Sequence, residues 1–274
     1  MEPPNIMHGK HDDSSFSLGT TFRVILITAL LGLAACGTTQ EPRQPVDLGM
    51  SAEELYEQAW RRIQGGNFDG AMQSLRRLEA RYPFSPEGQQ AQLDQIFVTY
   101  LQRDRRGTAE QANRFIRENP RSEHLPYAYY MQGMAWFETR GSFTRRVLGF
   151  DHARLNIRNA ERSFDAFREL VERYPDSDYA DDARLRMIYL RNTMARHHWY
   201  VARHYLDQGA YMAAAARATR VVEDLQPNAV TPYALDILIE AYAAVGEETL
   251  AADTRRVLDR SYPEHRRGQR PPAL

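Results

Sequence analysis

The stretch Arg81-Tyr82-Pro83-Phe84-Ser85 decides the fold, because variants of it recur along the chain. The other four copies are Glu118-Asn119-Pro120-Arg121-Ser122, Arg173-Tyr174-Pro175-Asp176-Ser177, Leu225-Gln226-Pro227-Asn228-Ala229 and Ser261-Tyr262-Pro263-Glu264-His265. The intervals between their prolines are 37, 55, 52 and 36 residues. Each copy follows an amphipathic, helix-forming stretch, and proline ends a helix because it lacks the N–H and clashes with the preceding turn. The recurrence therefore predicts repeated helical units.

Two positions upstream of each proline keep their character. Twelve residues before the prolines stand the small residues Ala71, Thr108, Ser163, Ala215 and Ala251. Five residues before them stand the apolar residues Leu78, Phe115, Leu170, Val222 and Leu258. This spacing is typical of the second half of a tetratricopeptide repeat (TPR), in which Ala-x3-Phe precedes a proline. Leu75 and Phe167 fit the Phe position, Ala112 and Thr219 fit it weakly, and Arg255 does not.

We therefore predict an all-α protein, a TPR solenoid of about five helix-turn-helix repeats over residues 51–265. The first helix should begin at Ser51, where Glu54 completes a capping box. The second should run from Phe68 to Tyr82. The two long proline intervals predict an insert at residues 139–159, within repeat three, and a lengthened helix over 179–206. Residues 266–274 should form a flexible tail.

The only cysteine, Cys36, follows the apolar run 24–35. Twelve residues are too few to span a bilayer, which takes roughly 20, but they fit the apolar part of a secretory signal flanked by Arg23. Leu33-Ala34-Ala35-Cys36 is similar to a bacterial lipobox, in which the cysteine is lipidated and becomes residue one. We expect a lipoprotein signal peptide at 1–35 and a lipidated tether at 36–50. A structural cysteine is the alternative.

The residues before the apolar run do not suit a signal peptide. Asp12 and Asp13 lie where such a peptide normally carries positive charge. The simplest explanation is a true start codon closer to Arg23, so we predict no domain in residues 1–20.

Composition excludes several function classes. Without residues 1–35, the chain has 33 basic and 33 acidic residues, whereas a sequence-independent nucleic-acid binder needs a basic excess. No phosphate loop or nucleophile elbow is present, and His197, His198 and His204 lack the spacing of a metal site. We therefore expect no enzyme activity, no cofactor and no metal.

Two groups of residues are candidates for protein binding. The predicted insert is basic and also apolar, with Arg145, Arg146 and Phe150, so it is either a loop packed over the solenoid or a partner-docking element. The first three repeats are rich in aromatic residues. Most must be core, but any on the concave face could receive an extended peptide.

Several motifs together resemble the BamD family, also called ComL or YfiO, the lipoproteins of the β-barrel assembly machinery. They are Asn67-Phe68, Arg81-Tyr82-Pro83-Phe84, Arg114-Phe115-Ile116-Arg117-Glu118-Asn119-Pro120, Gly149-Phe150-Asp151, Val201-Ala202-Arg203-His204-Tyr205 and Gly209-Ala210-Tyr211. The resemblance implies a protein at the periplasmic face of the outer membrane, held there by acyl chains on Cys36. The residue after Cys36 is Gly37 and not aspartate, and in this class of lipoproteins that implies sorting to the outer membrane.

The resemblance also implies partners. The C-terminal repeats would dock onto BamA, with Arg217 at the position of a family arginine in that contact. The second family arginine of this contact is Gln208 here. Arg145, Arg146, Phe150 and Asp151 in the insert are further candidates for partner contacts. The N-terminal repeats would bind unfolded barrel precursors and the accessory lipoproteins, with Phe84, Phe97 and Tyr100 as candidates for client binding. The alternative is a lipid-anchored TPR scaffold for peptidoglycan or cell-division machinery.

Overall fold

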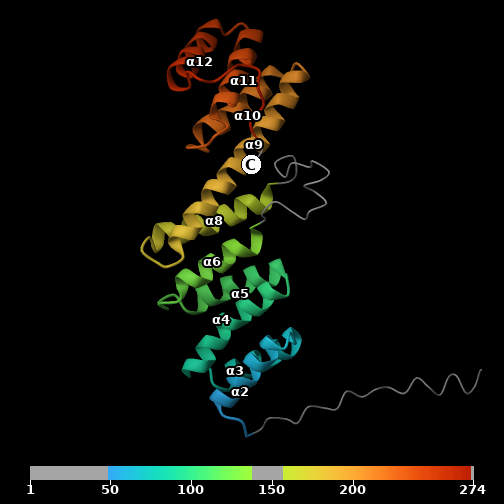
Figure 1. Cartoon of the computed structure of the whole chain (residues 1–274), viewed down its shortest axis with the longest axis vertical. Helices are drawn as coiled ribbons and strands as arrows, with labels where there is room; N and C mark the ends of the chain where they lie inside the picture. The colour runs from blue at the N-terminus through green and yellow to red at the C-terminus, as the bar shows by residue number, and fades with distance from the viewer. Residues whose placement is uncertain (1–48, 138–156, 273–274) are drawn as a thin grey trace, which may run out of the picture. The chain divides into compact units, whose positions relative to one another are not determined.

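The computed structural model describes residues 49–137 and 157–272, and the regular elements within these ranges are all α-helices. The first five are α2 (Ala52–Gln64), α3 (Phe68–Arg81), α4 (Pro86–Leu101), α5 (Arg105–Glu118) and α6 (Leu125–Trp136). The next five are α8 (Arg158–Arg173), α9 (Ala180–Asp207), α10 (Tyr211–Glu223), α11 (Thr231–Ala244) and α12 (Glu248–Ser261). Each helix packs against the next described helix along the chain (Figure 1). The all-α prediction and its helix-turn-helix order are confirmed.

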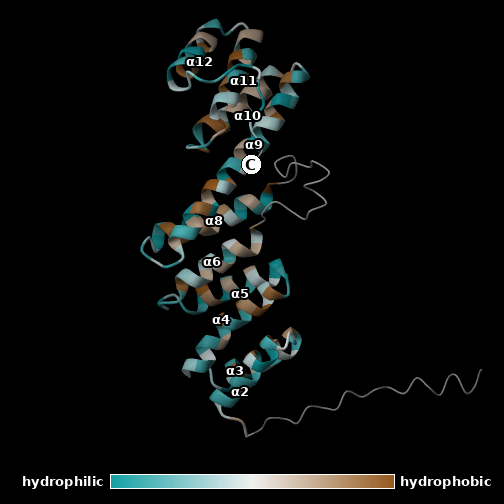
Figure 2. Cartoon of the chain, in the orientation of Figure 1, coloured by the Kyte–Doolittle hydropathy of each residue, from teal (hydrophilic) through white to brown (hydrophobic). Residues whose placement is uncertain are grey.

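The predicted helix boundaries hold at the N-terminal end. Ser51 caps α2, where its Oγ accepts a hydrogen bond from the Glu54 N–H and Glu54 Oε2 accepts one from the Ser51 N–H. Gly66, with a φ of 73°, then makes the turn to α3. Hydrophobic and hydrophilic residues are interleaved along the helices (Figure 2), as burial of one helix face requires.

The repeat register is visible in both burial and backbone geometry. All five small residues are buried, and so are four of the five apolar ones, namely Leu78, Phe115, Leu170 and Leu258. The residue before the proline ends α3, α5, α8 and α12 with nearly the same conformation, φ from −124° to −137° and ψ from 53° to 60°. Its N–H donates to the carbonyl of that buried apolar residue in each case. Proline excludes the α conformation from the residue before it, which explains the common end.

The fourth copy departs from this register. Three residues separate the end of α10 from Pro227, whereas one residue separates helix and proline in the other copies. Val221 is fully buried, but the predicted Val222 is only partly buried. The position five residues before the proline does not predict the buried residue in this copy, because the segment between α10 and Pro227 is longer than in the other copies.

Three hydrophobic clusters form the core, and two helices each contribute to two of them. Residues of α2, α3 and α4 form the first cluster, those of α4, α5, α6, α8 and α9 the second, and those of α9 to α12 the third. The 28-residue α9 places Ala183 and Leu190 in the second cluster and Ala195 to Leu206 in the third. The predicted lengthened helix is confirmed, and its length joins two parts of the core.

Two boundaries differ from the prediction. Helix α8 begins at Arg158, so the last two residues of the predicted insert are helical, whereas 138–156 lie outside the described residues. The tail was expected to fray, but Pro271 is buried and the Gly268 N–H donates to Asp236 on α11. The hydrogen bond from Gly268 to Asp236 holds the segment against α11. Within residues 49–137 and 157–272, no helix is long and apolar enough to cross a membrane.

Candidate protein-interaction surfaces

The structure describes four of the predicted binding residues, which are Phe84, Phe97, Tyr100 and Arg217. Cys36, Arg145, Arg146, Phe150 and Asp151 lie outside the described residues.

The three predicted client-binding aromatics are all described, but they differ in exposure. Phe84, between α3 and α4, is 93% exposed. Phe97 and Tyr100 lie near the other end of α4 and are half-buried, packed against the first and second core clusters respectively. A separation of 13 residues along the chain corresponds to roughly 20 Å when the segment is helical. Phe84 therefore offers an apolar surface by itself, whereas the other two serve the core in part.

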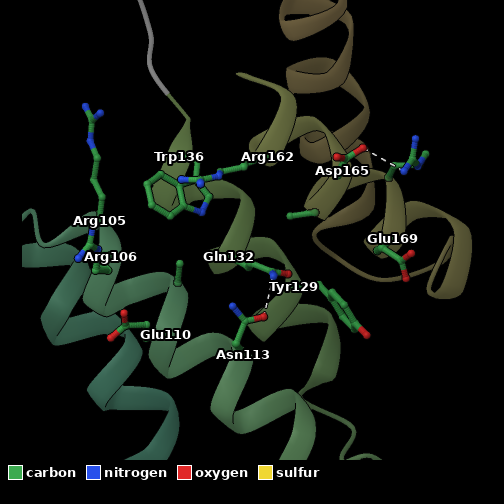
Figure 3. A pocket seen from close by; sticks show the side chains of 13 residues that line it. Arg105, Arg106, Glu110, Asn113, Tyr129, Gln132, Trp136, Arg162, Asp165 and Glu169 are labelled. Carbon is green, nitrogen blue, oxygen red and sulfur yellow. Dashed lines mark hydrogen bonds and ion pairs between the residues drawn. The ribbon is translucent and has the colours of Figure 1, made fainter. Parts of the chain in front are cut away.

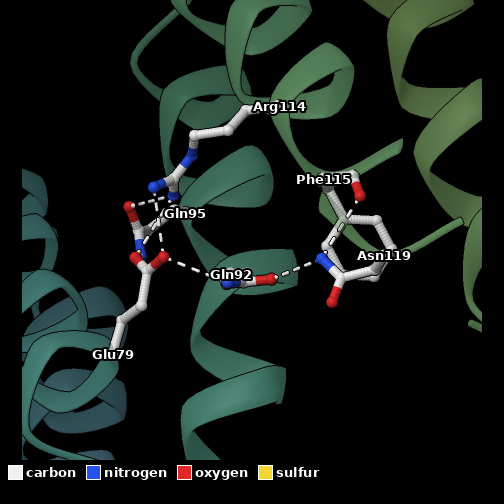
Figure 4. Close-up of polar contacts among 6 residues, drawn as sticks. All are labelled: Glu79, Gln92, Gln95, Arg114, Phe115 and Asn119. Carbon is white, nitrogen blue, oxygen red and sulfur yellow. Dashed lines mark hydrogen bonds and ion pairs between the residues drawn. The ribbon is translucent and has the colours of Figure 1, made fainter. Parts of the chain in front are cut away.

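A polar network gives several of the family-like motif residues a structural role (Figure 4). Arg114 on α5 donates to both carboxylate oxygens of Glu79 on α3, at 3.1 and 3.2 Å. Gln95 and Gln92 on α4 donate to the same carboxylate, and Asn119 donates to Gln92. Burial alone would raise the pKa of Glu79, but the hydrogen bonds from Gln95 and Arg114 hold it below its usual value. The network joins three helices, so these residues fix the packing of the first two helix pairs.

A second polar group lies on α2 and α4 without such a complete set of partners. Asp94 is 5% exposed, and its Oδ1 accepts a hydrogen bond of 3.0 Å from Gln90. Its Oδ2 is buried and accepts no well-directed hydrogen bond within the described part of the chain. Burial raises the pKa of Asp94, and the nearby donors Gln90, Tyr56 and Trp60 offset part of that rise. We call Tyr56, Trp60, Gln90, Asp94 and Tyr127 the Asp94 cluster.

The Asp94 cluster continues onto the first helix of the next pair. Burial and the charge of Asp94 raise the pKa of Tyr127 on α6. Its ring lies 5.9 Å from Tyr179, just before α9. The Asp94 carboxylate is therefore enclosed by aromatic side chains, of which Tyr56 and Trp60 are nearby hydrogen-bond donors.

Tyr130, Asp182 and Arg186 form a satisfied cluster farther along this surface. The Tyr130 hydroxyl donates to Asp182 Oδ2 at 2.6 Å, and Arg186 donates to the same oxygen. Burial and the bond to Asp182 raise the pKa of Tyr130 to about 12. The guanidinium of Arg186 stacks 4.6 Å from the ring of Phe137, the last described residue before the predicted insert. These contacts anchor α9 to α6.

A pocket of about 870 Å³ lies among α5, α6 and α8 (Figure 3). Arg162 stacks on Trp136 at 4.8 Å, and Gln132 donates to Asn113 at 2.8 Å across the pocket floor. The lining mixes four arginines, which are Arg105, Arg106, Arg162 and Arg168, with three acidic residues, which are Glu110, Asp165 and Glu169. The described residues hold no group of three or more His, Cys, Asp or Glu that could bind a metal ion. The mixed charge suits contacts with another polypeptide.

Arg217 lies on α10 in a positive environment. It is half-buried and has no acidic partner among the described residues. Burial, together with the charges of Arg220, His197 and Arg217, lowers the pKa of the buried His198 to about 4. His198 is therefore neutral at neutral pH, and Arg217 is free to pair with a carboxylate from outside the chain.

The sequence analysis missed the Asp94 cluster. The signal was available, because Asp94 interrupts the apolar run Leu93-Asp94-Gln95-Ile96-Phe97-Val98, and a carboxylate at such a position is rarely buried without a partner.

A chain of packed helix pairs, with exposed aromatic and unpaired charged groups on its surface, is a helical-repeat protein of the kind that binds other polypeptides. Comparison with known proteins identifies its family. A family model described as "YfiO: Outer membrane lipoprotein" matches residues 49–258, and the chain belongs to that family.

Curated relatives span most of the chain. "Outer membrane protein assembly factor BamD" of Neisseria meningitidis (strain Z2491) is 34% identical over 88% of this chain and 91% of its own length. The protein of the same name from Xylella fastidiosa (strain 9a5c) is 32% identical over 92% and 85%. Among solved structures, a thermophilic TPR protein from Thermus thermophilus is 15% identical over 78% of this chain and 93% of that chain. Its TM-score of 0.34 is too low to define the fold.

Proposed function

We propose that this protein is a lipid-anchored adaptor of the outer-membrane β-barrel assembly machinery. It binds BamA and unfolded barrel precursors at the periplasmic face of the outer membrane, where acyl chains on Cys36 hold it. Accessory lipoproteins of the machinery are further partners. The observation that carries the proposal is the family match over residues 49–258, together with relatives named as assembly factors that align over nearly their whole length.

The adaptor function is tested by its partners in the membrane. Affinity purification of the tagged full chain from solubilised outer membranes should recover BamA as a leading protein by mass spectrometry. Depletion of the chain should lower the amount of folded barrel proteins in the outer membrane. Recovery of peptidoglycan-binding or division proteins without BamA would instead favour the scaffold alternative.

We expect Arg217→Glu to release the protein from BamA. The half-buried guanidinium has no internal acidic partner among the described residues, so the substitution would place a carboxylate opposite the acidic group that we assign to BamA. Loss of a buried interfacial charge pair costs about 2–5 kcal/mol, which corresponds to at least a tenfold loss of co-purified BamA. Arg173→Glu, on α8 and paired with Glu169 at the surface, is the matched control and should leave co-purification unchanged. Equal recovery of BamA with both variants would show that Arg217 does not lie in the interface.

We assign client binding to the Asp94 cluster and the exposed Phe84. Asp94→Asn keeps the side-chain shape but loses the charge. It should weaken binding of a urea-unfolded outer-membrane barrel protein about fivefold, because a hydrogen bond to a charged acceptor is stronger by about 1 kcal/mol than one to a neutral acceptor. Asp253→Asn, at an exposed position on α12, is the control.

The same substitution should have the opposite effect on stability. The folded-state pKa of Asp94 is raised, so its favourable contribution is complete at acidic pH and is lost as the pH rises through that value. At pH 7 Asp94→Asn should therefore melt at a slightly higher temperature than the wild type. The difference should shrink toward pH 4. A variant that is less stable and binds clients normally would assign Asp94 to the core alone.

A further inference from the structure

The segment after α12 returns to the helices and lies against α9 and α11. The His265 side chain is 5% exposed, and its Nε2 lies 2.8 Å from Asp236 Oδ2. The Gly268 N–H donates to the same oxygen at 3.2 Å. Two residues of the segment, one through its side chain and one through its backbone, therefore share a single carboxylate on α11.

Farther along the segment, α9 supplies a second anchor. Arg196 is 3% exposed, and its Nη1 donates to the carbonyl of Pro271 at 3.4 Å. Pro271 itself is buried. A buried guanidinium that donates to a backbone carbonyl and a carboxylate that accepts a backbone N–H are the contacts that bind an extended polypeptide.

The surface under the segment has the composition of a peptide-binding groove. Trp199 on α9 and Tyr233 on α11 form its aromatic walls, joined by a hydrogen bond from Trp199 Nε1 to the Tyr233 carbonyl. The Tyr233 ring meets the His265 ring edge to face, with centroids 4.8 Å apart. The groove therefore recognises a ring as well as backbone groups.

The segment leaves part of the groove and one oxygen of Asp236 unoccupied. A cavity of about 640 Å³ remains between the segment and helices α9, α11 and α12. Asp236 Oδ1 is buried and has no hydrogen-bond partner in the described ranges. An acceptor left without a donor beside an open cavity leaves room for a second N–H from a bound chain.

We propose that the groove between α9 and α11 is a peptide-binding site and that the chain's own C-terminal segment, residues 265–272, occupies it in cis. Release of the segment opens the site to an extended polypeptide of the same chemistry, with backbone N–H donors and an imidazole or another cationic group for Asp236. The segment is thus an internal ligand that competes with any such partner. Because the segment is tethered, its effective concentration at the groove is of millimolar order. The segment therefore outcompetes a free ligand that is present at micromolar concentration.

Two substitutions in the full chain should release the segment while the groove stays intact. Gly268 has a φ of 74°, which proline cannot adopt, and proline has no N–H for Asp236. His265→Ala removes the ring contact and the bond to Asp236. Both positions follow the last helix, so the double variant His265→Ala/Gly268→Pro should keep the helical fold and lose only the stabilisation that the bound segment contributes.

The probe is a fluorescein-labelled synthetic peptide with the sequence of residues 262–272, and binding is measured by fluorescence anisotropy on purified protein. The double variant should bind the peptide at least tenfold more tightly than the wild type. Adding Asp236→Ala to the double variant should abolish this gain. Glu264→Ala, at an exposed position just before the segment, should bind as weakly as the wild type.

Proteolysis gives an independent readout of release. Trypsin cuts after Arg266 and Arg267, and cleavage needs an unfastened backbone. The Arg266–Arg267 bond should be cut at least tenfold faster in the double variant than in the wild type, whereas the bond after Arg267 becomes an Arg–Pro bond that trypsin does not cut. Equal cleavage rates, or a released segment without tighter peptide binding, would overturn the proposal, as would a gain that survives Asp236→Ala. No assembly partner is present in either assay, so these outcomes are separate from those that test the adaptor function.

Discussion

Cys36→Ser should remove the protein from the outer-membrane fraction almost completely. The proposed anchor consists of three acyl chains, and each buried CH₂ contributes about 0.8 kcal/mol to membrane binding. Stable anchoring needs two membrane-binding signals, and three acyl chains exceed that number. Serine has no thiol to lipidate, so all of this contribution is lost at once. Membrane fractionation followed by immunoblotting measures the effect.

The fold should survive this substitution. The three hydrophobic clusters are built from residues between Leu55 and Leu258, and the compact unit begins at Met50. The melting temperature of the variant should therefore match that of the wild-type chain, and Thr38→Ser is the control for fractionation. A variant that stays in the outer membrane would contradict lipidation of Cys36, and one that unfolds would make Cys36 a structural residue.

Phe167→Ala should destabilise the protein by about 3–5 kcal/mol, the usual cost of removing a buried phenylalanine. The ring is fully buried, 5.8 Å from Tyr130 and 6.1 Å from Phe137. It also fills the space beside Gly133, where an added Cβ would lie 2.5 Å from the ring. No neighbouring side chain can collapse into the resulting cavity without moving α6 or α8. Such a loss is a large part of the roughly 5–15 kcal/mol that stabilises a folded domain.

Thermal unfolding followed by circular dichroism measures this prediction, with an expected fall of about 6–20 °C for a domain of this size. Phe84→Ala is the matched control, because that ring is 93% exposed. Its effect should stay within about 0.5 kcal/mol, although it should weaken binding of the unfolded barrel protein. If the two variants melted alike, the proposed packing of Phe167 between α6 and α8 would be wrong.

Much of the helical framework was predictable because its signals are local. Proline ends a helix through its own ring, a capping box needs only four residues, and a small residue twelve positions before proline faces the neighbouring helix in every copy. The boundaries of α2, α3 and α9 follow from such signals. Val222 shows the limit, since the register fails where the segment before Pro227 lengthens.

The binding surfaces were less predictable, because they depend on which residues meet across helices. Phe97 and Tyr100 looked like surface aromatics, but α4 turns them partly into two core clusters. Arg114 looked like a motif residue, and the structure assigns it to the carboxylate of Glu79, 35 positions earlier. The apolar residues around Asp94 in the sequence indicate that it is buried, but they do not indicate which residues it contacts.

The sequence by itself determined the α-helical class, the repeat register and the expected anchor at Cys36, because each depends on residues close together in the chain. Only the tertiary structure decided that α9 joins two hydrophobic clusters, that Asp94 is buried beside Tyr56 and Trp60 and that the C-terminal segment lies on α11. His265 meets Asp236 across 29 positions, and Pro271 meets Arg196 across 75. Such contacts depend on the path of the whole chain, which no local pattern of charge or hydropathy encodes.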